Sequence, residues 1–314
     1  MLHRSVLALA AMLSLAAPAV GQEMRTQAQA PASKPSLIVA IAVDQFSADL
    51  FSQYRATFNG GLKRLAQGVV FPQGYQSHAA TETCPGHATI LTGVRPGRSG
   101  IIANYWIDQS IAREDKRVYC AEDPAVPGSS SKSYMVSLKR LRAETLGDRM
   151  KATDPASRVI ALSGKDRAAV MMGGHRTDQI WWWGPKGFAT FTGLTTTPTV
   201  DRVNTEALAT LSAESAPLPL PAHCAALDHP VAVTAIASVG NGRFARKTGD
   251  LGAFRSSPAL DQVTLDLADA LLDDQALGRR GHVDLLAISL SATDYVGHAY
   301  GTSGTEMCIQ IAQL

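Results

Sequence analysis

Two long apolar runs, each leading to a carboxylate, most constrain how this 314-residue chain can fold. Residues 36–44 are apolar almost throughout and end at Asp44, and residues 284–294 repeat the design and end at Asp294. Apolar residues on both faces are typical of a central strand in a parallel sheet. Because open α/β sheets carry their sites at the carboxyl ends of the strands, we expect Asp44 and Asp294 at the same edge.

Helix signals alternate with the strand signals along the chain. Start and stop residues predict helices over 55–67, over 137–151 with Ser137 as N-cap, and over 259–277 with Gly278 as the stop. This alternation predicts an α/β fold: a doubly wound, mostly parallel sheet with helices on both faces.

Residues 77–93 place a hydroxyl at the start of a short helix. Pro85 and Gly93 are the start and stop marks, so Thr83 lies at or just before the helix N-terminus. The free N–H groups and the dipole there favour negative charge. Threonine becomes a good nucleophile only when its pKa is lowered, which a bound metal does well. Taken alone, Thr83 is equally consistent with an N-cap.

Candidate metal ligands occur at both strand ends. Asp294 and His298 are four residues apart and share one face of a helical turn, and carboxylate and imidazole suit zinc. Considered singly, Asp44 could cap a loop, and Asp294 with His298 could form a surface pair. The joint occurrence of two acidic strand ends and a hydroxyl at a helix start favours a metal site.

Lys165 and Arg167 follow an apolar strand that begins at Arg158. Residues two apart in an extended segment point to the same face. A point charge and a bidentate fork aimed together suit a phosphate dianion. The alternative is an ordinary solvated Lys-Asp-Arg turn.

Five segments, in this order, resemble the alkaline phosphatase superfamily, and within it the monomeric, zinc-dependent bacterial alkaline phosphatases that use threonine. These segments are Val43-Asp44-Gln45, Thr83-Cys84-Pro85-Gly86-His87, Gly100-Ile101-Ile102-Ala103-Asn104, Gly164-Lys165-Asp166-Arg167 and residues 291–298. The resemblance implies hydrolysis of small phosphate monoesters through a threonine phosphoenzyme and two zinc ions. The implied roles are nucleophile for Thr83, one zinc site for Asp44 and Thr83, the other for Asp294 and His298, and phosphate binding for Asn104, Lys165 and Arg167.

Other members of the superfamily are the competing interpretations. Phosphodiesterases and nucleotide pyrophosphatases share the metal frame but resemble this chain less at 164–167, because a diester leaves fewer free oxygens to grip. A sulfatase would carry Cys or Ser at position 83 and Arg at position 87, where this chain has Thr83 and His87. An inactive phosphate-binding remnant is a third alternative.

The resemblance also implies insertions that cap the site, at about 105–136 and 174–256. The first range is polar and irregular, and the second contains a Thr/Pro/Ala-rich stretch. The run Trp181-Trp182-Trp183 in the second range is interpreted as packing, with a substrate entrance as the alternative.

Residues 1–21 have the pattern of a secretory signal peptide. A short basic start precedes an apolar stretch that is too short to span a membrane. Residues 22–36 are interpreted as a flexible linker and 37–314 as the catalytic region. The predicted location is therefore periplasmic or secreted, with no transmembrane segment after cleavage. The resemblance to monomeric alkaline phosphatases implies a monomer. A net charge of +2 without a basic run gives no case for nucleic-acid binding.

The four cysteines are informative in an exported protein. Cys84, Cys120, Cys224 and Cys308 can form two disulfides in three possible pairings, and a free thiol remains open for each.

The family pattern continues past residue 298 with an Asp-His pair and a later single His. This chain ends at Leu314 without them, which leaves two protein ligands for each zinc ion where catalytic zinc normally has three. We therefore expect the N-terminal part of an alkaline phosphatase, with a sheet incomplete at the C-terminus and impaired activity.

Overall fold

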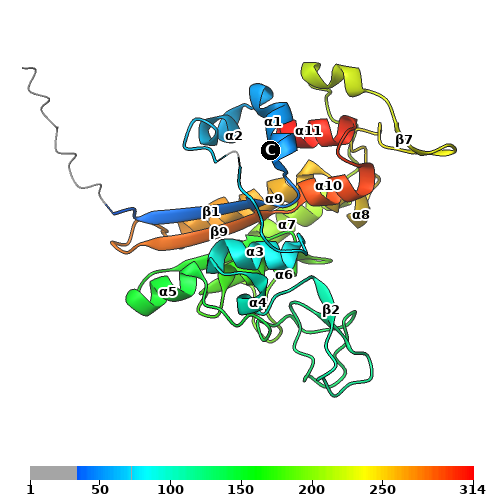
Figure 1. The fold of residues 1–314 in the computed structure, drawn as a ribbon. Helices are drawn as coiled ribbons and strands as arrows, with labels where there is room; N and C mark the ends of the chain where they lie inside the picture. The colour runs from blue at the N-terminus through cyan, green and yellow to red at the C-terminus, as the bar shows by residue number, and fades with distance from the viewer. Residues whose placement is uncertain (1–33, 72) are drawn as a thin grey trace, which may run out of the picture. The chain divides into compact units, whose positions relative to one another are not determined.

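A five-stranded sheet lies at the centre of the computed structural model, which describes residues 34–71 and 73–314 (Figure 1). Its first four strands in spatial order are parallel, and the fifth runs antiparallel to the fourth. The mostly parallel sheet that the sequence predicts is thereby confirmed. In spatial order the strands are β1 (Leu37–Val43), β9 (Asp284–Leu290), β4 (Val159–Ser163), β5 (Gln179–Gly184) and β6 (Gly187–Ala189).

The two long apolar runs are neighbouring strands. β1 pairs with β9 along its whole length, from Leu37 opposite Asp284 to Val43 opposite Leu290, so both strands end at the same level. β9 is buried throughout, as expected of a central strand. Within the described residues, however, β1 has only β9 as a neighbour, and Val39 and Ile41 are 47% and 44% exposed. An apolar sequence therefore indicates that a strand can be buried, but it does not predict how many strands lie beside it.

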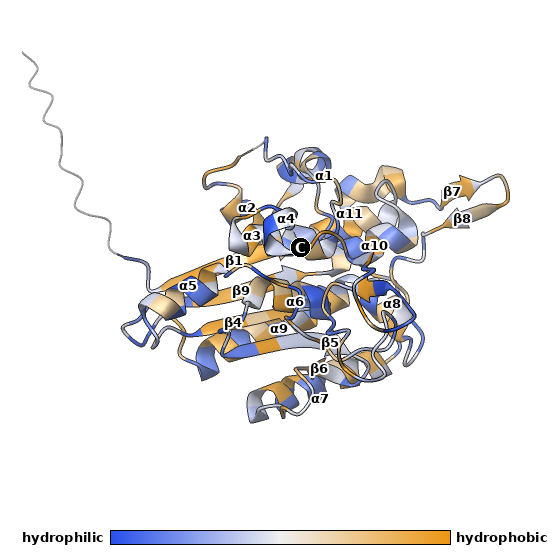
Figure 2. Cartoon of the chain, turned by 60° about the horizontal axis from the view of Figure 1, so that its bottom comes forward, coloured by the Kyte–Doolittle hydropathy of each residue, from blue (hydrophilic) through white to orange (hydrophobic). Residues whose placement is uncertain are grey.

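Helices cover both faces of the sheet because alternate strand residues point in opposite directions. Leu286 and Ile288 face one helical layer, whereas Leu285 and Ala287 face the other. Figure 2 shows the strands as largely apolar. The doubly wound architecture is confirmed. The first layer is α7 (Pro198–Ser212), α8 (Leu251–Arg255) and α9 (Pro258–Asp274); the second is α3 (Thr83–Thr92), α4 (Pro96–Ser99), α5 (Leu146–Thr153) and α6 (Asp166–Gly173).

A third apolar cluster lies beyond the carboxyl ends of β1 and β9. The disulfide Cys224–Cys308 fastens two of its segments together. Its helices are α1 (Ala48–Tyr54), η1 (Arg55–Thr57), α2 (Gly60–Leu65), η2 (Ala222–Leu227), α10 (Ala292–Tyr300) and α11 (Thr305–Gln313). Two small antiparallel ribbons complete the described elements: β2 (Tyr105–Ile107) with β3 (Arg117–Tyr119), and β7 (Val231–Thr234) with β8 (Ala237–Val239).

Two of the three predicted helices need correction. The segment 55–67 forms two short helices separated at Phe58. The helix predicted over 137–151 begins only at Leu146, because Thr145 and Asp148 form a reciprocal capping box there. The hydroxyl of Ser137 instead accepts a hydrogen bond from a nearby backbone N–H within a loop.

The range predicted as a second cap insertion, 174–256, supplies part of the core. Its strand β5 places Trp181 and Trp183 in the sheet at 3% and 6% exposure, and α7 packs beneath them. Packing is therefore the correct interpretation of these two tryptophans. None of the helices in the described ranges is both long and apolar enough to cross a membrane. The predicted signal peptide and most of the predicted linker lie outside the described residues.

Candidate active site

Asp44 and Thr83 meet at the carboxyl edge of the sheet. Asp44 directly follows β1, and the next residue, Gln45, turns the chain with a φ of 63°. Thr83 is the first residue of α3, as predicted, and the helix ends at Gly93 in the left-handed conformation. The Thr83 hydroxyl donates a hydrogen bond to Asp44 Oδ2 at 3.0 Å. A hydroxyl at a helix N-terminus thus contacts a carboxylate at a strand end.

Lys165 joins the two acidic strand ends. This residue is 3% exposed and caps the N-terminus of α6, and its Nζ lies 2.5 Å from Asp44 Oδ2. The same ammonium also pairs with Asp294 Oδ2. Asp294 lies in the first turn of α10, and His298 Nε2 is 3.4 Å from Asp294 Oδ1, on the same helix face, as expected from their spacing. Residues far apart in sequence therefore form one charged cluster.

The electrostatics of this cluster suit a cation. Burial alone would raise the pKa of Asp44, but the charges of Lys165 and His87 and the hydrogen bonds from Lys165 and Thr83 lower it below its ordinary value. Asp44 is therefore ionised at neutral pH. Two carboxylates converge on one positive charge, with a hydroxyl and an imidazole beside them. The donor set of Asp44, Thr83, Asp294 and His298 accordingly fits divalent metal ions.

Lys165 and Arg167 reach the site from a helix start. The sequence predicts an extended segment that includes both residues. In the structure Lys165 is the last extended residue, and α6 begins at Asp166, so Arg167 is helical. Lys165 Nζ lies 4.8 Å from the ring centroid of Tyr295. Arg167 is partly buried, and its Nε has no hydrogen-bond partner among the described residues.

Asn104 is fixed at the start of α3. Its Oδ1 accepts a hydrogen bond from the Cys84 backbone N–H at 2.8 Å, and its own backbone N–H donates to Glu82 Oε2 at 2.5 Å. Asn104 therefore lies beside the residue that follows Thr83. These contacts bring six of the predicted site residues together at the edge of the sheet where β1 and β9 end: Asp44, Thr83, Asn104, Lys165, Asp294 and His298. Arg167 lies two residues after Lys165, in the first turn of α6.

His87 is a member of the site that sequence reasoning left without a role. It is 4% exposed, with Nδ1 2.8 Å from the Thr83 carbonyl oxygen and Nε2 2.8 Å from Ser289 Oγ on β9. Burial lowers its pKa, against the attraction of Asp44, so the imidazole is neutral at neutral pH. It ties the first turn of α3 to the central strand. Its position four residues after Thr83, one helical turn on, is the signal that could have identified it.

Two disulfides resolve the pairing that the sequence left open. Cys84 pairs with Cys120, and Cys224 with Cys308. The first bond joins the residue after Thr83 to the segment 105–136. That segment is therefore attached directly to the first turn of α3.

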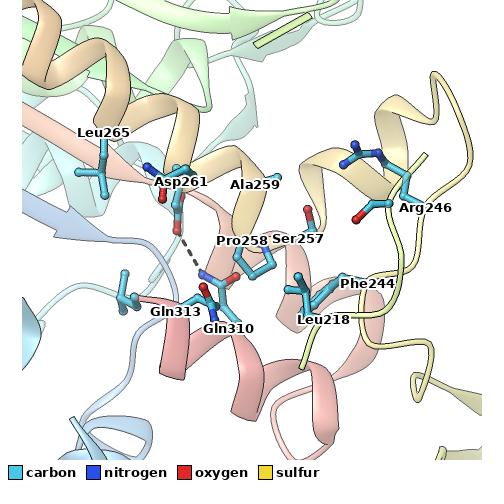
Figure 3. Close-up of a pocket in the computed structure, with 13 residues that line it drawn as sticks. Leu218, Phe244, Arg246, Ser257, Pro258, Ala259, Asp261, Leu265, Gln310 and Gln313 are labelled. Atoms are coloured by element: carbon cyan, nitrogen blue, oxygen red, sulfur yellow. Dashed lines mark hydrogen bonds between the residues drawn. The ribbon is translucent and has the colours of Figure 1, made fainter. Parts of the chain in front are cut away.

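A buried carboxylate supports α10 from beneath. Asp261, on α9, is 5% exposed and accepts a hydrogen bond from the Ala292 backbone N–H at 2.9 Å. Gln310 on α11 donates to the other oxygen at 3.2 Å, as Figure 3 shows. Burial raises the pKa of Asp261 to about 7, although these hydrogen bonds oppose the rise. Asp261 on α9 thus contacts both α10 and α11. Its contact on α10, Ala292, is two residues before Asp294.

Comparison with known proteins identifies the family. Residues 38–314 match the model described as type I phosphodiesterase / nucleotide pyrophosphatase. The chain belongs to this family. It is 55% identical over 285 residues to alkaline phosphatase PhoK of Sphingomonas sp. and 50% identical over 292 residues to alkaline phosphatase PhoD of Zymomonas mobilis. Each alignment covers 90% of the present chain.

Solved structures support the same relationship. The crystal structure of alkaline phosphatase PafA superposes with a TM-score of 0.76 at 28% identity, covering 89% of this chain and 57% of PafA. A second PafA structure carries substitutions of a threonine, an asparagine, a lysine and an arginine, and it gives a TM-score of 0.73 at 25% identity over the same shares of the two chains. The chain spans about half the length of the curated relatives it matches, 51% of PhoK and 49% of PhoD.

Proposed function

We propose that this chain carries the nucleophile and the phosphate-binding residues of a phosphomonoesterase that works through a threonine phosphoenzyme. The observation that carries the proposal is the convergence of Thr83, Asp44, Lys165 and Asp294 at the carboxyl edge of the sheet. The names of PhoK, PhoD and PafA, all alkaline phosphatases, support it.

Zinc is the proposed metal because the candidate ligands are carboxylate, hydroxyl and imidazole. Asp44 and Thr83 would hold one ion, and Asp294 and His298 the other. Bound there, two zinc ions would lower the pKa of the hydroxyl and stabilise the attacking and leaving oxygens.

The residues of the chain orient and activate the nucleophile. Asp44 accepts the Thr83 O–H hydrogen bond, so it aligns the hydroxyl and attracts its proton. The α3 dipole favours the negative charge that forms on this oxygen. A bond then forms between Thr83 Oγ1 and phosphorus while the bond from phosphorus to the ester oxygen breaks. The Thr83 proton passes to solvent, and the leaving oxygen takes up a proton from water and departs as the alcohol. Water hydrolyses the phosphothreonine and releases phosphate.

Asn104, Lys165 and Arg167 are the proposed phosphate ligands. A planar guanidinium and a compact ammonium grip the free oxygens of a dianion, and a diester has fewer of them. The substituted PafA supports this assignment: its replaced threonine and asparagine stand 21 positions apart, as Thr83 and Asn104 do, and its lysine and arginine two apart, as Lys165 and Arg167 do.

Phosphodiester or nucleotide pyrophosphate hydrolysis is the second candidate, because the family model bears that description. The test is the hydrolysis of p-nitrophenyl phosphate against bis-p-nitrophenyl phosphate by the purified chain at alkaline pH with added zinc. We expect faster turnover of the monoester and loss of turnover in Thr83→Ala. Preference for the diester would favour the second candidate. Phosphate binding without turnover by the folded chain would indicate a phosphate-binding protein instead.

A further inference from the structure

Two tyrosines of the segment 105–136 contact Asp166, which lies between the proposed phosphate ligands Lys165 and Arg167 in the sequence. Tyr119 OH donates a hydrogen bond to Asp166 Oδ1 at 2.7 Å, and Tyr134 OH donates to Asp166 Oδ2 at 2.9 Å. The two rings lie against each other with their centroids 4.5 Å apart and an angle of 37° between their planes. Each oxygen of Asp166 therefore accepts a hydrogen bond from a residue outside α6.

The same carboxylate fixes the backbone of Arg167. Asp166 Oδ1 also accepts a hydrogen bond from the Arg167 backbone N–H at 2.7 Å. Tyr119 lies beside the Arg167 side chain: burial would lower the pKa of Arg167, but Tyr119 and Asp166 raise it above its ordinary value. Asp166 therefore joins Tyr119 to Arg167, because it accepts hydrogen bonds from the Tyr119 hydroxyl and from the Arg167 backbone N–H.

Tyr119 is itself rigidly placed. It is 1% exposed and is followed by Cys120, whose disulfide to Cys84 lies next to Thr83. The Cys120 backbone N–H donates to the Asn104 carbonyl oxygen at 2.9 Å. The stretch Tyr119–Cys120 thus contacts Asn104 itself, and it contacts Cys84 and Asp166, which are the chain neighbours of Thr83, Lys165 and Arg167.

We propose that Tyr119 and Tyr134 are positioning residues that hold Asp166 and, through it, aim Arg167 at the phosphate of a monoester. The inference rests on the proposed function, and it assigns the segment 105–136 a part in substrate recognition. The consequence is substrate selectivity. Displacement of Arg167 should lower kcat/KM for a monoester more than for a diester, because the monoester has more charged free oxygens for the guanidinium to bind.

The tyrosine hydroxyls remain hydrogen-bond donors at alkaline pH. Burial and then the charge of Asp166 raise the pKa of both Tyr119 and Tyr134 above the ordinary value of 10. The two hydrogen bonds to Asp166 therefore persist under the alkaline conditions proposed for turnover.

The test uses Tyr119→Phe and Tyr134→Phe, which remove one hydroxyl each and keep the contact between the rings. Tyr105→Phe is the matched control. The Tyr105 ring lies in the same segment, with its centroid 5.0 Å from that of Tyr119, but no hydrogen bond joins its hydroxyl to Asp166. The measurements on the purified chain with zinc are inorganic phosphate affinity by calorimetry, the kcat/KM ratio of monoester to diester, zinc affinity and thermal melting.

We expect Tyr119→Phe to weaken phosphate binding and to lower the monoester-to-diester ratio, each on the order of tenfold, since hydrogen bonds to charged groups are involved. Tyr134→Phe should act in the same direction but less, and Tyr105→Phe should match the wild type. Zinc affinity should not change, whereas the melting temperature of Tyr119→Phe should fall because a buried hydrogen bond to a carboxylate is lost. Unchanged phosphate affinity in Tyr119→Phe, or an equal loss of kcat/KM for the monoester and the diester, would overturn the inference. A wild-type chain that binds no phosphate would refute the proposed function and this inference with it.

Discussion

The buried acid beneath α10 gives the sharpest quantitative prediction. The ordinary pKa of aspartate is 3.8, and burial raises that of Asp261 to about 7. Below pH 4 the carboxyl is protonated in both the folded and the unfolded chain, and no stability is lost. Between pH 4 and pH 7 the unfolded chain releases the proton and the folded chain retains it, so stability falls as pH rises. Above pH 7 the loss is complete, at about 4 kcal/mol.

Asp261→Asn should abolish this pH dependence. Asparagine has the same shape and can accept the hydrogen bond from the Ala292 N–H. Gln310 Oε1 has no partner among the described residues, so rotation of this amide lets it accept from the new NH₂ group. Relative to the wild type, the variant should therefore gain roughly 2–3 kcal/mol of stability between pH 5 and pH 8.

The assay is urea unfolding followed by circular dichroism at pH 5 and pH 8, with the disulfides intact. Asp269→Asn is the control, because Asp269 is an exposed acid on the same helix. The control should change stability by the same small amount at both pH values. If Asp261→Asn also shifts stability equally at pH 5 and pH 8, the reasoning about the buried carboxyl is wrong.

Three further changes test the core and the cross-links by urea unfolding. Gly174→Ala should destabilise by about 3 kcal/mol, because the residue has a φ of +84° and a Cβ would lie 2.3 Å from Thr145 Oγ1; a loss below about 1 kcal/mol would contradict this. Leu267→Ala, at a fully buried position of α9, should lower the free energy of unfolding by about 2–5 kcal/mol. A smaller loss would mean that neighbouring side chains move in to fill the cavity. Replacing Cys224 and Cys308 together by serine opens a link across 84 residues and should cost about 4 kcal/mol; unchanged stability would show that the bond constrains little.

Local sequence patterns were sufficient to locate the carboxyl ends of β1 and β9 and the helix α3 that begins at Thr83. Asp44 and Asp294 follow apolar runs whose length and flanks fix their place in a parallel sheet. Thr83 lies before a Pro and a later Gly that delimit α3. In contrast, the helix predicted from Ser137 does not form, because two potential caps compete and Thr145 has the reciprocal partner.

Contacts between distant segments could not be derived in the same way. That Lys165 bridges two carboxylates 121 and 129 residues away depends on strand order, which composition does not specify. The tyrosines that hold Asp166 lie in a range whose polar, irregular sequence predicts only an insertion. The spacing of apolar residues predicts whether a residue is buried or exposed. It does not predict which distant residue it contacts, because that depends on the order of the strands and helices in the whole fold.

The central claim is that Thr83 becomes covalently phosphorylated. The most direct measurement is acid quenching of the zinc-loaded chain during turnover of p-nitrophenyl phosphate, followed by peptide mass spectrometry. The account predicts one added phosphoryl group on the peptide containing Thr83, absent from Thr83→Ala. Turnover with the phosphoryl group on another residue, or with no covalent phosphopeptide under any quench condition, would contradict it.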